Sequence, residues 1–123
     1  MEFDVLSKRV IGCAIEVHRQ LGPGLLETTY EQCLAYELVQ AGIVYKLQLA
    51  LPVNYKGLRL DCGYRIDVLV QNALILELKS VDAVLGIHQA QLLTYMKLAG
   101  IETGLLINFN VMQLKSGIQR FIL

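Results

Sequence analysis

The segment 73–80 constrains the fold most, because it is apolar on both faces of an extended chain and yet carries two charges. It reads Ala-Leu-Ile-Leu-Glu-Leu-Lys-Ser. A short apolar run without helical periodicity predicts an inner strand that is covered on both sides. Glu77 and Lys79 are two residues apart, so their side chains point to the same face. This charged pair on an inner strand is therefore the first candidate for a functional site.

The pattern on either side of this strand alternates between helical and extended segments. Helical periodicity followed by glycine predicts three helices: 5–21, 25–40 and 86–99. Extended patterns predict five strands, at 44–55, 58–70, 73–80, 103–109 and 118–123. A turn is expected at 56–57, and a short helical turn within 111–115. The order ααβββαββ predicts an α/β (α+β) fold, a mixed sheet flanked by helices, in one domain over 1–123.

Asp67 is the third candidate, and the face to which it points depends on the register of the hairpin that follows. A loop of two residues would pair Asp67 with Leu76, whereas a loop of three residues, 71–73, pairs it with Glu77. Asn72 tolerates the left-handed conformation that such loops often use, which favours the longer loop. We therefore expect the carboxylates of Asp67 and Glu77 on one face of the sheet.

Two carboxylates on neighbouring strands suit Mg²⁺ or Mn²⁺, since these ions prefer oxygen ligands. The carbonyl of Leu78 could add a further ligand. A metal ion held by Asp67 and Glu77 would polarise a phosphate group and lower the pKa of its bound water. Lys79 would offer a positive charge to the phosphate or to the attacking water. This combination predicts hydrolysis of a phosphodiester, in which charge develops on the phosphate oxygens.

A structural ion pair is the alternative interpretation, because carboxylates and lysines are common on solvent-facing strands. Glu27 and Gln89 favour a site, since both fall on otherwise apolar helical stripes and need polar partners there. His18 also lies on an inner stripe, where a packed, hydrogen-bonded histidine is the commoner case, and its role stays open. Tyr30 is expected in the core with its hydroxyl bonded. Arg65 shares the face of Asp67, where it would meet a carboxylate or a phosphate.

Composition limits the partners and the compartment. Eleven basic and eleven acidic residues give a net charge of zero, which argues against a strongly electrostatic binder of duplex DNA. The three cysteines form no CxxC pair, so we expect reduced and mostly buried thiols rather than a zinc site or a disulfide framework. No signal peptide layout and no apolar run long enough to span a membrane is present, which predicts a cytoplasmic protein. The 54% apolar content makes a homo-oligomer plausible.

Several motifs in the same order resemble the GxxExxY protein family, which is assigned to the PD-(D/E)XK nuclease superfamily. The naming motif matches Gly-Leu-Leu-Glu-Thr-Thr-Tyr at 24–30. Further matches extend from about 10 to 109: Glu16-Val17-His18, Tyr55-Lys56-Gly57, Tyr64-Arg65-Ile66-Asp67, Glu77-Leu78-Lys79, His88-Gln89-Ala90-Gln91 and Leu106-Ile107-Asn108-Phe109. A series of matches in the right order is more specific than any single motif.

This resemblance implies a restriction-endonuclease-like core with the order α-β-β-β-α-β. The superfamily's helical glutamate falls on Glu27, its metal-binding aspartate on Asp67 and its ExK pair on Glu77 and Lys79. Gln89 matches the polar residue that is often found on the following helix. The resemblance thus implies Asp67 and Glu77 as metal ligands, with Lys79, Glu27 and Gln89 as catalytic residues.

Three functions follow for a chain of this kind. The first is an Mg²⁺-dependent nuclease that acts on DNA or RNA. The second is a hydrolase of a smaller phosphoester or short oligonucleotide, which the zero net charge and the lack of a DNA-binding extension favour. The third is a binding or assembly module that keeps the fold without turnover.

Overall fold

A five-stranded mixed sheet forms the centre of the computed structural model, which describes residues 4–123. The strands are, in spatial order, β1 (Tyr45–Ala50), β4 (Arg65–Val70), β5 (Leu74–Lys79), β6 (Thr103–Asn108) and β7 (Ile118–Ile122). Strands β5 and β6 run parallel because a helix crosses between them, and the other neighbours are antiparallel. The predicted mixed sheet flanked by helices is confirmed.

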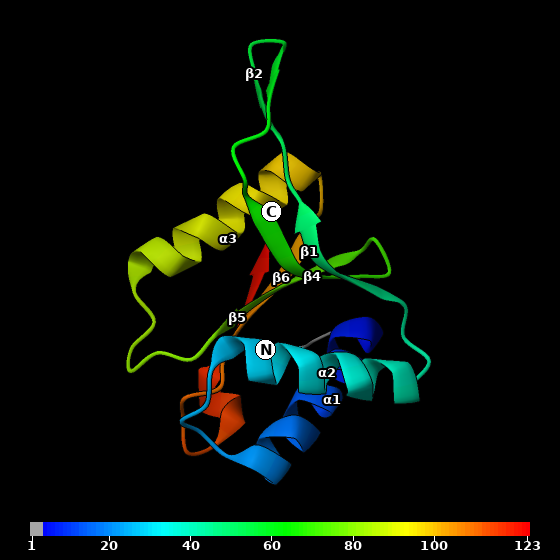
Figure 1. Cartoon of the computed structure of the whole chain (residues 1–123), viewed down its shortest axis with the longest axis vertical. Coiled ribbons are helices and arrows are strands. Elements are labelled where there is room, and N and C mark those ends of the chain that lie inside the picture. The colour runs from blue at the N-terminus through cyan, green and yellow to red at the C-terminus, as the bar shows by residue number, and fades with distance from the viewer. Residues whose placement is uncertain (1–3) are drawn as a thin grey trace.

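Helices cover both faces of this sheet (Figure 1). Helices α1 (Val5–Leu21) and α2 (Glu27–Gln40) lie together on one side, and α3 (Gly86–Ala99) lies on the other. A short 3₁₀ helix, η1 (Leu114–Gly117), precedes β7. The predicted bounds of α1 and α3 are correct, and α2 begins two residues later than expected. Gly100 ends α3 in the left-handed conformation, at φ 68° and ψ 31°.

Strand β5 is buried on both faces, as its apolar pattern predicts. Leu74, Leu76 and Leu78 belong to the core beneath α1 and α2. Ile75 faces the opposite way, into the core that α3 covers with Leu92 and Met96. Side chains alternate between the two faces along a strand, so the odd-numbered residues Glu77 and Lys79 point to the same face as Ile75.

The expectation of one continuous strand over 44–55 and another over 58–70 is wrong. Strands β2 (Val53–Tyr55) and β3 (Leu58–Leu60) pair with each other in a separate two-stranded sheet. Pro52 has no N–H for the ladder at the point where β1 ends. Gly63, at φ 79°, interrupts the extended backbone between β3 and β4. The hairpin over residues 52–64, called the arm below, projects beyond the rest of the molecule (Figure 1).

The expectation of mostly buried thiols is wrong, since none of the three cysteines is fully buried. Cys13 and Cys33 are half-buried, Cys62 is exposed, and all three thiols are free. Within residues 4–123 there is no helix whose length and apolar character would allow it to cross a membrane.

Candidate active site

The hairpin between β4 and β5 has the loop of three residues that the sequence predicts. Val70 pairs with Leu74, and the backbone N–H of Ala73 donates to the carbonyl of Val70. Gln71 and Asn72 both have positive φ angles, 51° and 53°, which asparagine tolerates better than most residues. This loop sets the register of the whole hairpin.

That register brings Asp67 and Glu77 to neighbouring positions on the two strands. Val68 pairs with Leu76, so Asp67 and Glu77 are next along the ladder. The carboxylate Oδ2 of Asp67 accepts a 2.9 Å hydrogen bond from the backbone N–H of Leu78. The side chain of Asp67 therefore lies against β5 between Glu77 and Lys79, as expected.

Glu77 is a buried carboxylate without a full set of partners. Its side chain is 6% exposed, and its Oε2 atom makes no hydrogen bond. Burial raises the pKa of Glu77 to about 7; the charge of Lys79 opposes this rise, and Asp67 and Glu27 add to it. Burial also raises the pKa of Asp67, against the hydrogen bond from Leu78. Both carboxylates are thus costly to ionise as they stand and would gain from a bound cation.

Lys79 lies close enough to lower the pKa of both Asp67 and Glu77. Even so, the two ion pairs within 4.0 Å among residues 4–123 are Arg19–Glu16 and Arg120–Asp4, and neither involves Lys79. A structural ion-pair network would bring the ammonium group into direct contact with a carboxylate. The geometry of Lys79 therefore favours a charge that faces the site over one that is neutralised by a neighbour.

Glu27 reaches the same end of the sheet from the first residue of α2. Its Oε2 atom accepts a hydrogen bond of 3.2 Å from the backbone N–H of Ser80, directly after β5. The hydroxyl of Ser80 donates to the carbonyl of Leu25 at 2.6 Å. These two bonds fix the start of α2 against the end of the strand that carries Glu77 and Lys79. An open pocket of about 380 Å³ lies here, and its walls include Leu26 and Thr28.

Tyr30 holds the loop that leads into Glu27. Its hydroxyl donates to the carbonyl of Gly22 at 2.6 Å and accepts from the N–H of Leu25 at 3.1 Å. Its ring stacks on Phe109 at 4.4 Å, with an angle of 6° between the planes. The expectation of a core tyrosine with its hydroxyl bonded is confirmed, and the structure adds a role in positioning Glu27.

Replacing Tyr30 with phenylalanine is expected to lower the free energy of unfolding by about 1–2 kcal/mol, because two hydrogen bonds of a buried group are lost. The stacking on Phe109 should survive the change. Urea denaturation of the variant beside the wild type measures the effect. Tyr36→Phe, at an exposed position of the same helix, is the matched control and should change stability by less than about 0.5 kcal/mol. Equal stability of the two variants would contradict the positioning role.

Two residues of this region escaped the sequence analysis. Glu31 lies one helical turn after Glu27 and is buried, and its Oε1 atom accepts a 2.6 Å hydrogen bond from Nε2 of Gln48. Burial raises the pKa of Glu31, and the charge of Asp67 adds to the rise. Gln48, at φ 50°, lies between Leu47 and Leu49 of the β1–β4 ladder, and its side chain also hydrogen-bonds Asp67. The spacing of four between Glu27 and Glu31 was the available signal, whereas the strained backbone of Gln48 left none.

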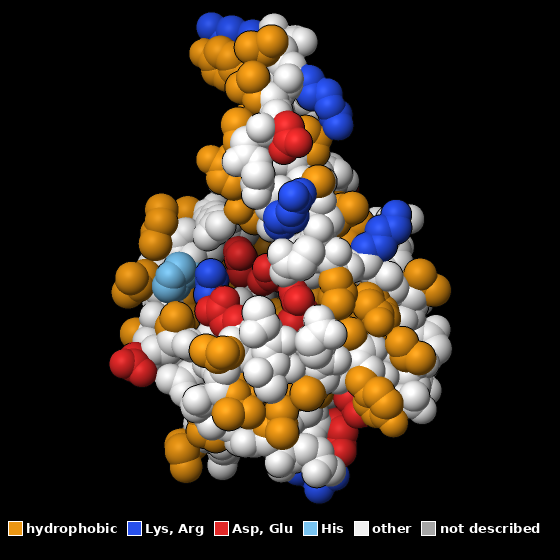
Figure 2. Space-filling view, in the orientation of Figure 1, with side chains coloured by type: hydrophobic (Ala, Val, Ile, Leu, Met, Phe, Trp, Pro, Cys, Tyr) orange, Lys and Arg blue, Asp and Glu red, His pale blue; other side chains and the backbone are white. Residues whose placement is uncertain are grey.

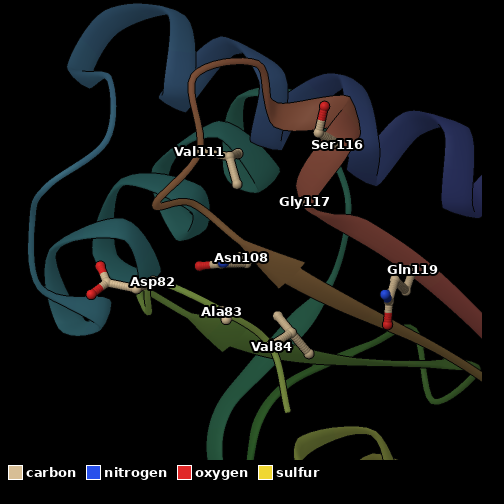
Figure 3. A pocket seen from close by; sticks show the side chains of 8 residues that line it. All are labelled: Asp82, Ala83, Val84, Asn108, Val111, Ser116, Gly117 and Gln119. Atoms are coloured by element: carbon tan, nitrogen blue, oxygen red, sulfur yellow. The ribbon is translucent and has the colours of Figure 1, made fainter. Parts of the chain in front are cut away.

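A polar pocket of about 280 Å³ lies beside the site (Figure 3). It is bounded by the segment after β5, the end of β6, η1 and the start of β7. Asn108 pairs with Lys79 across the parallel strands and is buried in the wall of the pocket. Its amide bonds both the N–H and the carbonyl of Val81, so it fixes the chain that leaves the site. Asp82 and Gln119 line the pocket at opposite sides in this view, and the carboxylate of Asp82 points away from Gln119.

The sequence of the chain also matches a known superfamily of proteins. The model of the PD-(D/E)XK nuclease superfamily matches residues 4–121. The chain belongs to this superfamily. No curated protein and no solved structure is significantly similar to it. The predicted superfamily is therefore confirmed, and the match extends from the start of α1 into β7.

Nucleases of the PD-(D/E)XK superfamily generally use divalent metal ions, and the carboxylates present fit such an ion in part. Among residues 4–123 there is no group of three or more His, Cys, Asp or Glu side chains placed to hold a metal. Asp67 and Glu77 nevertheless offer two neighbouring carboxylates, and Oε2 of Glu77 has no protein partner. Mg²⁺ is commonly bound by one or two carboxylates with several waters. Acidic side chains gather in a hollow at the middle of one face, with a basic side chain among them (Figure 2).

Gln89 and His18 make contacts other than those expected at a nuclease site. Nε2 of Gln89 donates to Oε1 of Gln119 on β7 at 2.8 Å. Nε2 of His18 lies 2.8 Å from the carbonyl of Val111, and its ring is tilted against Phe109 at 6.5 Å. His18 therefore joins α1 to the segment before η1, as a packed histidine does. A catalytic role for Gln89 stays a prediction based on the resemblance.

Proposed function

We propose that the chain is a metal-dependent nuclease that hydrolyses phosphodiester bonds of nucleic acid. The observation that carries the proposal is the buried, incompletely bonded carboxylate of Glu77 beside Asp67, with Lys79 next to it and not ion-paired within 4.0 Å among residues 4–123. Such an arrangement costs stability without a cation, and it supplies the ligands and the positive charge that phosphodiester cleavage needs. Membership of the PD-(D/E)XK nuclease superfamily supports the same conclusion.

The proposed roles follow from position. Asp67 and Glu77 would hold Mg²⁺ or Mn²⁺, which when bound supplies positive charge to the phosphate and acidifies a water molecule. The N–H of Leu78 orients the carboxylate of Asp67. Lys79 places its charge where a phosphate oxygen or the attacking water would lie. Glu27 fixes the edge of the site through Ser80 and adds negative charge.

We further propose that, within the superfamily, the chain is a GxxExxY protein. The structure gives two residues of that motif, at 24–30, a physical purpose. Glu27 contacts the end of β5, and Tyr30 anchors the loop before it. This support is local to one motif, and the match of the superfamily model does not depend on it.

The test is cleavage by the purified chain with labelled single- and double-stranded DNA and RNA, and with a small phosphodiester. We expect cleavage of at least one nucleic acid in Mg²⁺ or Mn²⁺ and none in EDTA. Asp67→Asn should abolish both cleavage and metal binding by calorimetry, because the metal loses a charged ligand. Glu102→Gln, the same loss of one negative charge at an exposed residue at the opposite end of the β5–β6 ladder, should keep both. Metal binding with turnover of the small phosphodiester alone would favour the second candidate function.

We also propose a homo-oligomer. Large apolar side chains are exposed on α1 and α2, among them Ile15, Tyr36 and Val39. Such side chains gain free energy when a second subunit covers them. The site described above does not require a partner subunit.

A further inference from the structure

The arm is an unusual element, because within residues 4–123 its strands pair only with each other and most of their residues are open to solvent. Asn54, Tyr55 and all residues of β3 are exposed. An isolated two-stranded hairpin is marginally stable in water at best. Figure 1 shows the arm extending away from the body of the molecule. A partner could therefore contact this ribbon along its exposed strands and at its tip.

Charge on and beside the arm is unlike that of the chain as a whole. Lys56, Arg59 and Arg65 are exposed there, with Asp61 as the acidic residue. Three cations against one carboxylate give the segment 52–65 a net charge of +2, whereas the whole chain is neutral. Basic side chains lie at the tip and along the side of the projection in Figure 2. The neutral total therefore hides a local separation of charge.

An aromatic ring accompanies these cations at the tip. Tyr55 is 58% exposed, and the ammonium group of Lys56 lies 5.4 Å from the centre of its ring. Exposed aromatic rings beside cations suit contact with sugars and bases next to phosphates. Apolar side chains of Leu58 and Leu60 are also exposed on β3, so self-association is the competing use of this ribbon.

The position of the arm links it to the candidate active site. Arg65 pairs with Ala50 at the end of the β1–β4 ladder. The arm leaves the sheet directly at that pair, and Asp67 follows two residues later. A linear polyanion that placed one phosphate at Asp67 and Glu77 could therefore continue along Arg65 toward Arg59 and Lys56.

We propose that the arm binds the phosphate backbone of a nucleic acid whose cleaved phosphodiester lies at the candidate active site, an inference that rests on the proposed function. A two-stranded β-ribbon has the dimensions to enter the major groove of duplex DNA. Lys56 and Arg59 supply the backbone contacts, and Arg65 leads from them to the site. The arm thus provides the DNA-binding extension that the sequence appeared to lack. Its clustered cations can attract phosphate groups even though the net charge of the whole chain is zero.

The test is binding without cleavage, measured by fluorescence anisotropy in EDTA with a short labelled DNA duplex, its single strand and an RNA hairpin. The variant is Lys56→Glu with Arg59→Glu. We expect its affinity for the preferred nucleic acid to fall at least about tenfold, and its dependence on salt to weaken by about two phosphate contacts. Both side chains are exposed, so thermal stability should be unchanged.

The matched control is Lys8→Glu with Lys115→Glu, which makes the same change of charge at exposed positions of α1 and η1. It should change affinity by less than about threefold. Equal binding by the arm variant and the wild type would overturn the proposal, even if the wild type cleaves nucleic acid. Binding that depends on the arm, with no cleavage under any condition, would keep the arm proposal and contradict the nuclease function. Loss of self-association in the arm variant, with no nucleic-acid binding by the wild type, would assign the ribbon to a second copy of the chain.

Discussion

Replacing Lys79 with alanine is expected to reduce the rate constant of phosphodiester cleavage at least about a hundredfold, with little change in Mg²⁺ affinity. The proposal assigns the metal to Asp67 and Glu77 and the phosphate or water to Lys79. Removing the ammonium group therefore takes away charge that matters most in the transition state. Single-turnover cleavage and calorimetric titration with Mg²⁺ measure the two quantities separately.

The same variant distinguishes a site from a structural ion pair. Lys79 has no ion pair within 4.0 Å in the described part of the chain, so the variant should lose no more than about 1 kcal/mol of stability. Lys79→Arg keeps the charge and should recover part of the rate. Lys46→Ala, an exposed lysine on β1, serves as the control. Destabilisation by several kcal/mol in Lys79→Ala, without any metal binding by the wild type, would support the ion-pair interpretation instead.

The ExK pair was predictable because it depends on local information. Burial of 73–80 on both faces follows from its composition, and the shared face of Glu77 and Lys79 follows from the two-residue period of a strand. Asp67 needed one further fact, the length of the hairpin loop, and Asn72 indicated it. The start of α2 was within two residues, so Glu27 could be placed at the site.

The arm could not be predicted from alternation, because alternating residues look the same in a paired strand and in an exposed ribbon. Leu58 and Leu60 continue the pattern of Ile66 and Val68 in the sequence, yet the first two are exposed and the last two are buried. Pro52 and Gly63 mark the interruptions, but either residue is also found at bulges and edges. Glu31 and Gln48 depend on how α2 and β1 pack against β4, which local sequence does not specify.

Stability of the metal-free protein is expected to fall as the pH rises from about 4.5 to about 7. The unfolded chain releases the proton of Glu77 near its ordinary pKa of 4.5, whereas burial raises the pKa in the folded protein to about 7. Between these values the folded state binds more protons than the unfolded state, so the free energy of unfolding decreases with pH. The shift corresponds to a loss of about 3 kcal/mol, which is complete just above pH 7. The raised pKa of Asp67 acts in the same direction.

Glu77→Gln isolates this contribution, because glutamine resembles the protonated acid in size and cannot ionise. In EDTA at pH 8 we expect the variant to be more stable than the wild type by up to about 3 kcal/mol, and near pH 4.5 we expect the two to be similar. Urea denaturation across this range measures the difference. Glu37→Gln, on α2 away from the carboxylate pair and half-exposed, is the matched control and should leave the pH dependence unchanged.

Addition of Mg²⁺ at pH 8 should reverse the order of stability, because a cation that binds only the folded state stabilises the wild type and finds one carboxylate fewer in Glu77→Gln. A protein that keeps a buried charge for metal binding thus gives up stability in the absence of the metal and recovers it on binding. A less stable Glu77→Gln variant at pH 8 in EDTA would show that the ionised carboxylate has a structural partner. In that event Glu77 would belong to the scaffold, and the case for a metal at this position would be lost.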